Sequence, residues 1–251
     1  MKPVAIQLYT VRDACAKDFF GTLKKIADIG YKGVEFAGLH GAKPAEVAKV
    51  VKDLGLAVSS SHAGLPAKDN VAQIVDQEKT LGSRRIVTGF GPNDLKTADD
   101  CKKAADRLNA AAELVKPHGM EIGYHNHWWE FSRIGTRTAH EILFSSVADN
   151  VFAQIDVYWT AYGKSDPVKV VKRMAKRVPL LHLKDGTLEE NKPHTAIGSG
   201  KLDMAAIIGA ADPKVLDWLI VELDSCETDM MEAVRQSYIY LTSHKLAQGN
   251  K

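Results

Sequence analysis

Short apolar runs alternate with longer amphipathic segments along the whole chain, and this alternation restricts the fold more than any other feature. The runs are rich in β-branched and aliphatic residues, as β-strands are, whereas the segments between them carry apolar residues at helical spacing. Eight such runs occur, beginning at Val4, Gly33, Ala57, Arg85, Met120, Val151, Val178 and Asp217. Eight strand and helix units in about 250 residues match the dimensions of a closed (β/α)8 barrel, the TIM barrel.

The alternative to a barrel is an open, doubly wound sheet, which also alternates strands and helices. Such sheets often place a glycine-rich nucleotide-binding turn after the first strand. The segment "YTVRDACAKDFF" at 9–20 contains no motif of this kind. No linker, low-complexity tract or block of like charge divides the chain. We therefore predict an α/β fold, a (β/α)8 TIM barrel, with residues 1–251 forming a single domain.

Composition and charge limit the kind of partner. The 33 Lys and Arg residues nearly balance the 31 Asp and Glu residues, which leaves a formal charge of +2. A chain with so little net charge has no general attraction to nucleic acid or to anionic lipid. No apolar run is long enough to cross a membrane. We expect a small-molecule ligand, with no nucleic acid and no membrane as partner.

The three cysteines, Cys15, Cys101 and Cys226, are far apart and form no CxxC pair. They indicate neither a disulfide framework nor a thiolate zinc site. The first residues, "MKPVAIQLYT", lack the apolar stretch of a signal peptide. These features predict a cytoplasmic protein, and the alternative of an export signal ahead of residue 1 stays open.

Polar residues end most of the predicted strands. In a TIM barrel the carboxyl ends of the strands meet at one mouth, where the active site is built. A charged residue within an apolar strand is costly unless it pairs or binds something. The polar residues at these ends are Glu35, His62, His125, His127, Asp156, His182, Lys184, Asp185, Glu222 and Asp224. The fifth to eighth strands each contribute at least one, so imidazoles and carboxylates are expected to converge there.

Imidazole and carboxylate groups without thiolates are typical ligands of a divalent metal ion. We predict that the metal ligands are His125, Asp156, His182 and Glu222, one from each of these four strands. Mn, Co, Fe, Ni and Zn are all candidates, whereas Mg²⁺ prefers oxygen ligands. A single histidine at a strand end is more often structural, so the prediction depends on the whole set.

Motifs in the same regions resemble those of the xylose-isomerase-like sugar isomerase and epimerase superfamily. They are "LYTVRD", "GYKGVEFAG", "SSSHAG", "YHNHWWEF", "IDVYW", "HLKDG", "AIGSGKLD" and "IVELD", in this order over almost the whole chain. The superfamily includes ketose 3-epimerases, inosose dehydratase and the endonuclease IV branch of DNA repair. The resemblance implies a metal-dependent barrel that acts on a sugar, and it makes a homo-oligomer an expectation.

The metal ligands of this superfamily are usually Glu, Asp, His and Glu, from strands five to eight. The last three correspond to Asp156, His182 and Glu222 of this sequence. His125 stands where the first glutamate is expected, and Glu130 lies five residues further on. One carboxylate fewer makes the site less negative and the metal a stronger Lewis acid. It also removes one of the two carboxylates that, in the epimerases, move a proton on either face of the sugar.

Further roles are assigned to residues near the predicted ligands. Glu222 is expected to act also as the base that removes a proton next to a carbonyl. Lys184 lies two residues after His182 and so on the same face of the strand. It either donates to a substrate oxygen, as a catalytic residue, or forms an ion pair with Asp156 or Asp185. The predicted substrate-binding residues are Glu35, His62, His127, Glu130 and Trp159, with a structural hydrogen bond as the alternative for Glu35 and His62.

Two other features belong to the surroundings of the predicted site. Trp128, Trp129 and Trp159 offer rings that can stack on a sugar, and we expect one of them to contact substrate. The segment "NKPHTAIGSGKLD" at 191–203 contains two glycines, and we expect it to be a mobile lid over the mouth.

Three functional hypotheses follow. The first is a divalent-metal-dependent isomerase or epimerase that removes a proton next to the carbonyl of a ketose or keto-sugar. The second is a metal-dependent lyase, dehydratase or hydratase acting on an inosose or 3-keto-glycoside, since inosose dehydratase, by the resemblance, also has a histidine pair after strand five. The third is a catalytically silent sugar-binding barrel. DNA repair is disfavoured because a charge near zero offers no basic groove.

Overall fold

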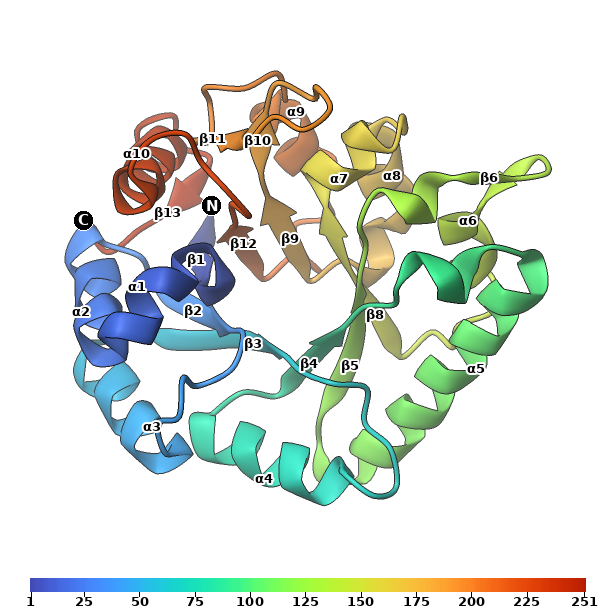
Figure 1. The fold of residues 1–251 in the computed structure, drawn as a ribbon, viewed down its shortest axis with the longest axis horizontal. Helices are drawn as coiled ribbons and strands as arrows, with labels where there is room; N and C mark the ends of the chain where they lie inside the picture. The colour runs from blue at the N-terminus through green and yellow to red at the C-terminus, as the bar shows by residue number, and fades with distance from the viewer.

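The computed structural model describes residues 1–251, and its central feature is a closed barrel of parallel strands (Figure 1). The barrel strands are β1 (Lys2–Gln7), β2 (Gly33–Phe36), β3 (Ala57–His62), β4 (Arg85–Thr88), β5 (Glu121–His125), β8 (Val151–Asp156), β9 (Leu180–Leu183) and β12 (Trp218–Val221). They pair in this order, and β12 pairs with β1 to close the ring. Each apolar run of the sequence is one of these strands, which confirms the predicted single-domain TIM barrel.

Helices surround the ring of strands (Figure 1). They are α1 (Arg12–Lys17), α2 (Phe19–Ile29), α3 (Pro44–Asp53), α4 (Val71–Leu81), α5 (Ala98–Val115), α6 (Ala139–Phe144), α7 (Val157–Tyr162), α8 (Pro167–Met174), α9 (Met204–Gly209) and α10 (Met230–Ser243). Short strands lie outside the barrel, namely β6 (Arg133–Ile134), β7 (Arg137–Thr138), β10 (Asp185–Gly186), β11 (His194–Thr195) and β13 (Ala247–Gln248). The last of these pairs with the start of β1, so the two ends of the chain lie side by side.

The inside of the barrel is apolar near the amino ends of the strands. A small cluster fills it, made of Ala5, Val87, Phe152, Leu180 and Ile220. The packing is so close that a Cβ atom on Gly123 would overlap the ring of Phe152. This part of the barrel is therefore a solid floor.

The interior becomes polar one layer further toward the carboxyl ends. Side chains two residues apart on a strand share a face, and four of the five floor residues are followed two positions later by an inward-facing polar residue. The polar layer includes Gln7, Gln154, His182 and Glu222, which follow Ala5, Phe152, Leu180 and Ile220 respectively. All four polar side chains are buried. The strand pattern thus places a buried polar site directly on an apolar floor.

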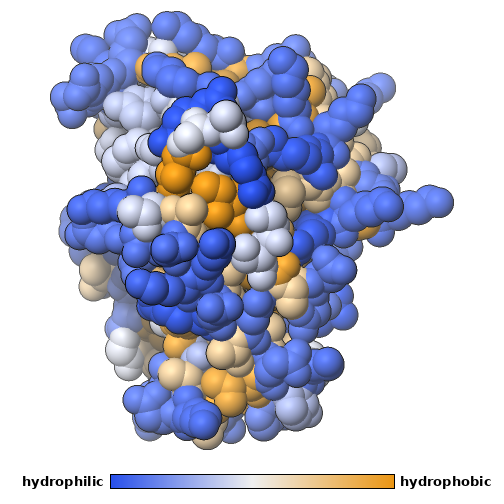
Figure 2. Space-filling view, turned by 90° about the vertical axis from the view of Figure 1, so that its right-hand side faces the viewer, coloured by the Kyte–Doolittle hydropathy of each residue, from blue (hydrophilic) through white to orange (hydrophobic).

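The outer surface is mainly hydrophilic. Figure 2 shows the face that carries α5 and α6, where polar and charged residues surround smaller apolar areas. No helix offers the apolar length that a bilayer crossing requires.

Candidate metal centre

The four predicted ligands meet at the carboxyl ends of β5, β8, β9 and β12. Each of His125, Asp156, His182 and Glu222 is buried and offers one donor atom, and these atoms all lie within 4.8 Å of one another. We call these residues the four-ligand cluster. An ion held about 2.1 Å from each donor keeps the donors roughly 3–4 Å apart, so the spacing suits a divalent metal ion.

Asp156 offers one free carboxylate oxygen to the cluster. Its Oδ1 atom accepts a hydrogen bond of 2.8 Å from the backbone N–H of Trp159 and so caps α7. Its Oδ2 atom is buried and accepts no hydrogen bond of good geometry, although the Nζ atom of Lys184 lies 3.1 Å away. A buried oxygen without an aligned donor is costly in a protein interior, and a metal ion would satisfy it. Burial raises the pKa of Asp156, which shows how strongly this carboxylate lacks solvent.

Glu35 lies under the cluster, fully buried, and binds residues from across the barrel. Its carboxylate accepts hydrogen bonds from Gln7 Nε2 at 2.6 Å, from Gln154 Nε2 at 2.6 Å, and from the hydroxyl of Ser60. Burial alone would raise the pKa of Glu35, but the imidazoles of His62 and His182 hold it well below its usual range. Glu35 is therefore an ionised support beneath the site.

His182 bridges two carboxylates. Its Nε2 atom lies 2.6 Å from Glu35 Oε1, and its Nδ1 atom lies 2.7 Å from Glu222 Oε2. Burial would lower the pKa of His182, yet these two carboxylates raise it to about 10. A metal ion on Nδ1 would take the place of the proton shared with Glu222, while the bond from Nε2 to Glu35 would keep the ring oriented.

Gln154 fixes the tautomer of His125, and our sequence analysis missed it. Because Gln154 donates its Nε2 hydrogen to Glu35, its Oε1 atom must be the acceptor for the nearby histidines. That oxygen lies 3.0 Å from His125 Nδ1 and 2.8 Å from His62 Nε2. His125 therefore carries its hydrogen on Nδ1 and presents Nε2, which lies 3.9 Å from Asp156 Oδ2, as a free ligand.

The neutral state of the His125 imidazole also suits a metal ligand. Burial and the neighbouring His182 imidazole hold the pKa of His125 well below its usual range, so the ring is neutral at pH 7. Gln154 lies two residues before Asp156 on β8, in the run "VFAQID". The one signal in the sequence is an amide on the inward face of an apolar strand, which does not by itself show what the amide binds.

Lys184 forms buried ion pairs, as one of the two sequence alternatives expected. Its Nζ atom lies 3.1 Å from Asp156 Oδ2, 2.9 Å from Glu222 Oε2 and 3.0 Å from Asp224 Oδ1. Burial opposes its charge, but the three carboxylates raise the pKa of Lys184 far above its usual range. The expected alternative pairing with Asp185 does not form, because the Asp185 carboxylate is bound elsewhere.

Asp185 instead ties down the loop that follows β9. Its carboxylate accepts hydrogen bonds from the backbone N–H groups of Gly186, Gly198, Gly200 and Leu202. A Cβ atom at Gly200 would overlap this carboxylate. The expected mobility of a lid at 191–203 stays a prediction, although the amides of Gly198, Gly200 and Leu202 hold the second half of this segment against Asp185.

A cavity of about 870 Å³ opens above the cluster. Of the predicted substrate-binding residues, His62, His127 and Trp159 line it. The other two, Glu35 and Glu130, are fully buried and do not line it. Glu130 accepts hydrogen bonds from the hydroxyl of Tyr124 and the backbone N–H of His127.

The two buried glutamates thus support histidines, and contact with substrate stays a prediction for His62, His127 and Trp159. The lining also includes three residues that our sequence analysis did not assign to the site, Tyr9, Phe90 and Arg107. Tyr9 follows β1, Phe90 follows β4, and Arg107 lies in α5. None of them is a polar residue at a strand end, which is the pattern from which the site was predicted.

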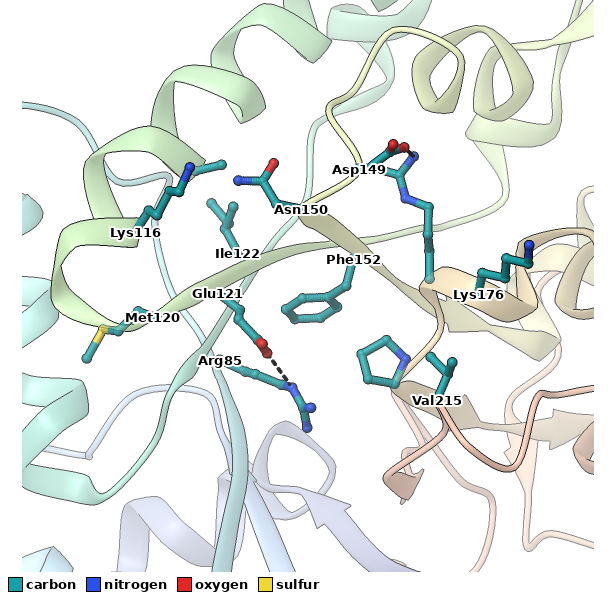
Figure 3. Close-up of a pocket in the computed structure, with 13 residues that line it drawn as sticks. Arg85, Lys116, Met120, Glu121, Ile122, Asp149, Asn150, Phe152, Lys176 and Val215 are labelled. Carbon is teal, nitrogen blue, oxygen red and sulfur yellow. Dashed lines mark hydrogen bonds and ion pairs between the residues drawn. The ribbon is translucent and has the colours of Figure 1, made fainter.

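A second cavity, of about 410 Å³, lies at the opposite end of the barrel (Figure 3). Arg85 extends toward Glu121 there, with 3.0 Å between Nε and Oε2, and it also pairs with Asp217. Phe152 belongs to the same lining and to the barrel floor. Arg177 lies 3.8 Å from Asp149 at this end, and the apolar floor separates these charges from the four-ligand cluster.

Comparisons with known proteins agree with this architecture. The sequence pattern of the family described as "Xylose isomerase-like TIM barrel" matches residues 23–243. A crystal structure of a sugar phosphate isomerase/epimerase from Parabacteroides distasonis ATCC 8503 has a TM-score of 0.82 to this chain at 25% identity, and the match covers 98% of this chain and 96% of that one.

Curated relatives match over shorter regions. Inosose dehydratase from Clostridium beijerinckii is 27% identical over 146 residues, which is 50% of this chain and 48% of the relative. Inosose dehydratase from Geobacillus kaustophilus is 26% identical over 193 residues, which is 65% of this chain and 60% of the relative. The matched region thus spans about half to three fifths of the length of these relatives.

Proposed function

Because the chain belongs to the xylose isomerase-like TIM barrel family, we propose that it is a divalent-metal-dependent enzyme that removes a proton next to the carbonyl of a ketose or keto-sugar, as an isomerase or epimerase does. The observation that carries this proposal is the buried four-ligand cluster under an open cavity. The similarity to a sugar phosphate isomerase/epimerase supports the same class of chemistry.

The metal ion, which would be held by His125, Asp156, His182 and Glu222, would polarise the carbonyl and so acidify the neighbouring C–H bond. The protein itself has to supply the base. Burial would raise the pKa of Glu222, but Lys184 and His182 hold it well below its usual range. Glu222 is therefore ionised at neutral pH, lines the cavity, and is the group that accepts the proton.

Lys184 acts as a fixed positive charge beside this base. Its raised pKa means that the ammonium does not release its proton at neutral pH. Lys184 lines the cavity, and its Nζ atom lies within 3.1 Å of a carboxylate oxygen of both Asp156 and Glu222. Its positive charge therefore keeps Glu222 ionised beside the position where the proton is removed.

The number of basic groups in the site affects which reaction follows removal of the proton. With His125 in place of the glutamate expected from the family pattern, Glu222 is the carboxylate of the cluster that is poised as base. One base can return the proton to the neighbouring carbon on the same face of the sugar, which is isomerisation. Epimerisation needs a second proton carrier on the opposite face, and His62, which lines the cavity, is the available group.

A second candidate is a dehydratase, in which the same proton is removed and a β-hydroxyl group then leaves. It is supported by the single carboxylate base and by the similarity to inosose dehydratases. The two reactions share their first step, so the same residues serve both.

The test follows carbon-bound protons in D₂O. Protein loaded with Mn, Co or Zn is incubated with ketoses, inososes and 3-keto-glycosides, and spectra are recorded by NMR after the metal has been chelated. Asp156→Ala removes a ligand, and Asp99→Ala, at an exposed position on α5, is the matched control. Metal binding to each protein is measured by calorimetry.

Deuterium next to the carbonyl together with an isomeric sugar would support the isomerase, and loss of water would support the dehydratase. Both activities should vanish in Asp156→Ala and persist in Asp99→Ala. A wild-type protein that binds no divalent metal would contradict both readings and favour a silent sugar-binding barrel.

A further inference from the structure

The cavity above the four-ligand cluster has no positive charge left for an anionic substrate group. Lys184 is paired with Asp156, Glu222 and Asp224. Arg107 is paired with Asp94, at 2.9 Å between Nη1 and Oδ1, and its guanidinium lies over the ring of Phe90. The lining contains two cations and two carboxylates, so the charges cancel. A phosphate group carries about two negative charges, and it would find no unpaired lysine or arginine among the side chains that line the cavity.

The glycine-rich segment after β9 offers no free backbone amides in place of cations. Convergent N–H groups in a glycine-rich loop are a common phosphate site, and "AIGSG" at 196–200 resembles such a loop. Its amides at Gly198 and Gly200 donate to the carboxylate of Asp185, at 3.0 Å and 3.1 Å. The chain's own carboxylate thus fills the position that a phosphate would take.

The outer part of the cavity is aromatic instead of charged. Trp128 and Tyr9 both line it, and their side chains stay 41% and 45% exposed although they are large and apolar. Trp128 is held in place by Trp129 and Trp159, whose ring centroids lie 4.6 Å and 4.7 Å from its own. Supported rings with a free surface are suited to stacking against another ring.

The size of the cavity leaves room for more than one ring. Its volume of about 870 Å³ falls near the upper end of the range of about 300–1,000 Å³ that holds drug-sized ligands. The polar part, near His125 and Glu222, and the aromatic part, near Trp128, belong to the same cavity.

We propose that the substrate is an uncharged keto-glycoside without phosphate, whose keto-sugar ring lies over the four-ligand cluster while a second ring stacks on Trp128. The inference rests on the proposed function, because it assigns a substrate class to the same site. It separates this chain from the solved relative described as a sugar phosphate isomerase/epimerase.

The test measures binding by tryptophan fluorescence and calorimetry, without turnover. The probes are matched pairs built on glucose, galactose and xylose, namely the methyl and phenyl glycosides, and each free sugar and its terminal phosphate ester. We expect the best phenyl glycoside to bind about tenfold more tightly than its methyl partner, as a buried ring contact would give. No phosphate ester should bind more tightly than its parent sugar.

Variants identify the ring that makes the contact. Trp128→Ala should reduce the preference for phenyl over methyl to less than about twofold, whereas Trp128→Phe, which keeps a ring, should retain most of it. Phe20→Ala, at an exposed aromatic residue on α2 outside the cavity, is the control and should leave the preference unchanged. Circular dichroism checks that each variant is folded.

Several outcomes would overturn the inference: tighter binding of a phosphate ester, equal binding of phenyl and methyl glycosides, a full preference in Trp128→Ala, or no binding of any glycoside at its solubility limit. Failure of the proposed function looks different. Selective glycoside binding without deuterium exchange would support the proposed substrate class and contradict the proposed reaction. Turnover of a sugar phosphate would support the proposed reaction and contradict the proposed substrate class.

Discussion

Replacing Gln154 with leucine tests whether the orientation of His125 depends on the residue beneath it. Gln154 donates one hydrogen bond to Glu35 and accepts from both His125 and His62. Gln7 offers a matched comparison, because it is also fully buried and also donates to Glu35 at 2.6 Å, but it does not touch His125. Gln154→Leu and Gln7→Leu therefore each remove one hydrogen bond to Glu35, and only Gln154→Leu also removes the hydrogen-bond acceptor of the His125 imidazole.

The expected magnitudes differ between folding and metal binding. Each variant removes one donor from a buried, ionised carboxylate, so each should lower the free energy of unfolding by roughly 2–3 kcal/mol. Loss of a group that orients a ligand typically weakens metal binding about 10–100-fold, which is roughly 1.4–2.7 kcal/mol. This second loss is expected for Gln154→Leu alone.

The assay is calorimetric titration of Zn²⁺ into both folded variants, with the tautomer of His125 read from its imidazole nitrogen shifts by NMR. Wild type and Gln7→Leu should carry the hydrogen on Nδ1, whereas Gln154→Leu should show a mixture. Equal Zn²⁺ affinity in the two variants, or an unchanged tautomer in Gln154→Leu, would refute the role assigned to Gln154.

Three further outcomes are expected. His140 is buried between aromatic rings with neither nitrogen hydrogen-bonded, and burial lowers its pKa to about 3. Because the unfolded chain protonates His140 near pH 6.5 and the folded protein does not, the wild-type protein loses stability as the pH falls below about 6.5. Leucine cannot bind a proton, so the free energy of unfolding of His140→Leu, measured with urea, should rise by about 2 kcal/mol relative to wild type between pH 7.5 and pH 5. A difference that does not change with pH would contradict this. Gly200→Ala, which overlaps Asp185, should cost about 1–3 kcal/mol and speed proteolysis of the loop, whereas Gly209→Ala, in open space, should do neither. Lys184→Met should destabilise the metal-free protein by about 3–5 kcal/mol, and added Zn²⁺ should raise its melting temperature more than that of wild type.

The barrel and the convergence of the four-ligand cluster were predictable because both follow from local patterns. Strand runs and helical spacing are properties of a few consecutive residues, and the order of eight such units leaves the closed barrel as the simplest arrangement. The four residues proposed as ligands were predicted to converge because parallel strands end at one mouth. His125, Asp156, His182 and Glu222 needed only their places at strand ends to be grouped.

The supporting residues were harder to predict because their role depends on partners far away in the sequence. Glu35 was expected either to bind substrate or to form a structural hydrogen bond, and the sequence could not decide because its partners Gln154 and His182 lie 119 and 147 positions further along the chain. No local pattern shows which of two inward-facing polar residues lies beneath the other. Gln7 and Gln154 were visible in the sequence as amides in apolar strands, but an isolated amide does not show which residues it binds.

The packing of the loop after β9 could not be predicted because glycine has two different uses. It permits motion, and it permits close approach of backbone to another group. The sequence alone does not separate these uses at Gly198 and Gly200. The decisive feature is the carboxylate of Asp185, whose four amide partners appear only when the loop is folded around it.

The bonds of Glu35 across the barrel also affect how this chain can fold and be divided. A half-barrel of β1 to β4 contains Glu35 with Gln7, Ser60 and His62, but Gln154 and His182 belong to the other half. Removing partners from a buried charge costs about 3–5 kcal/mol, a large part of the stability of a domain. The two halves should therefore not fold as separate units, and the metal ligands should come together only when the ring closes.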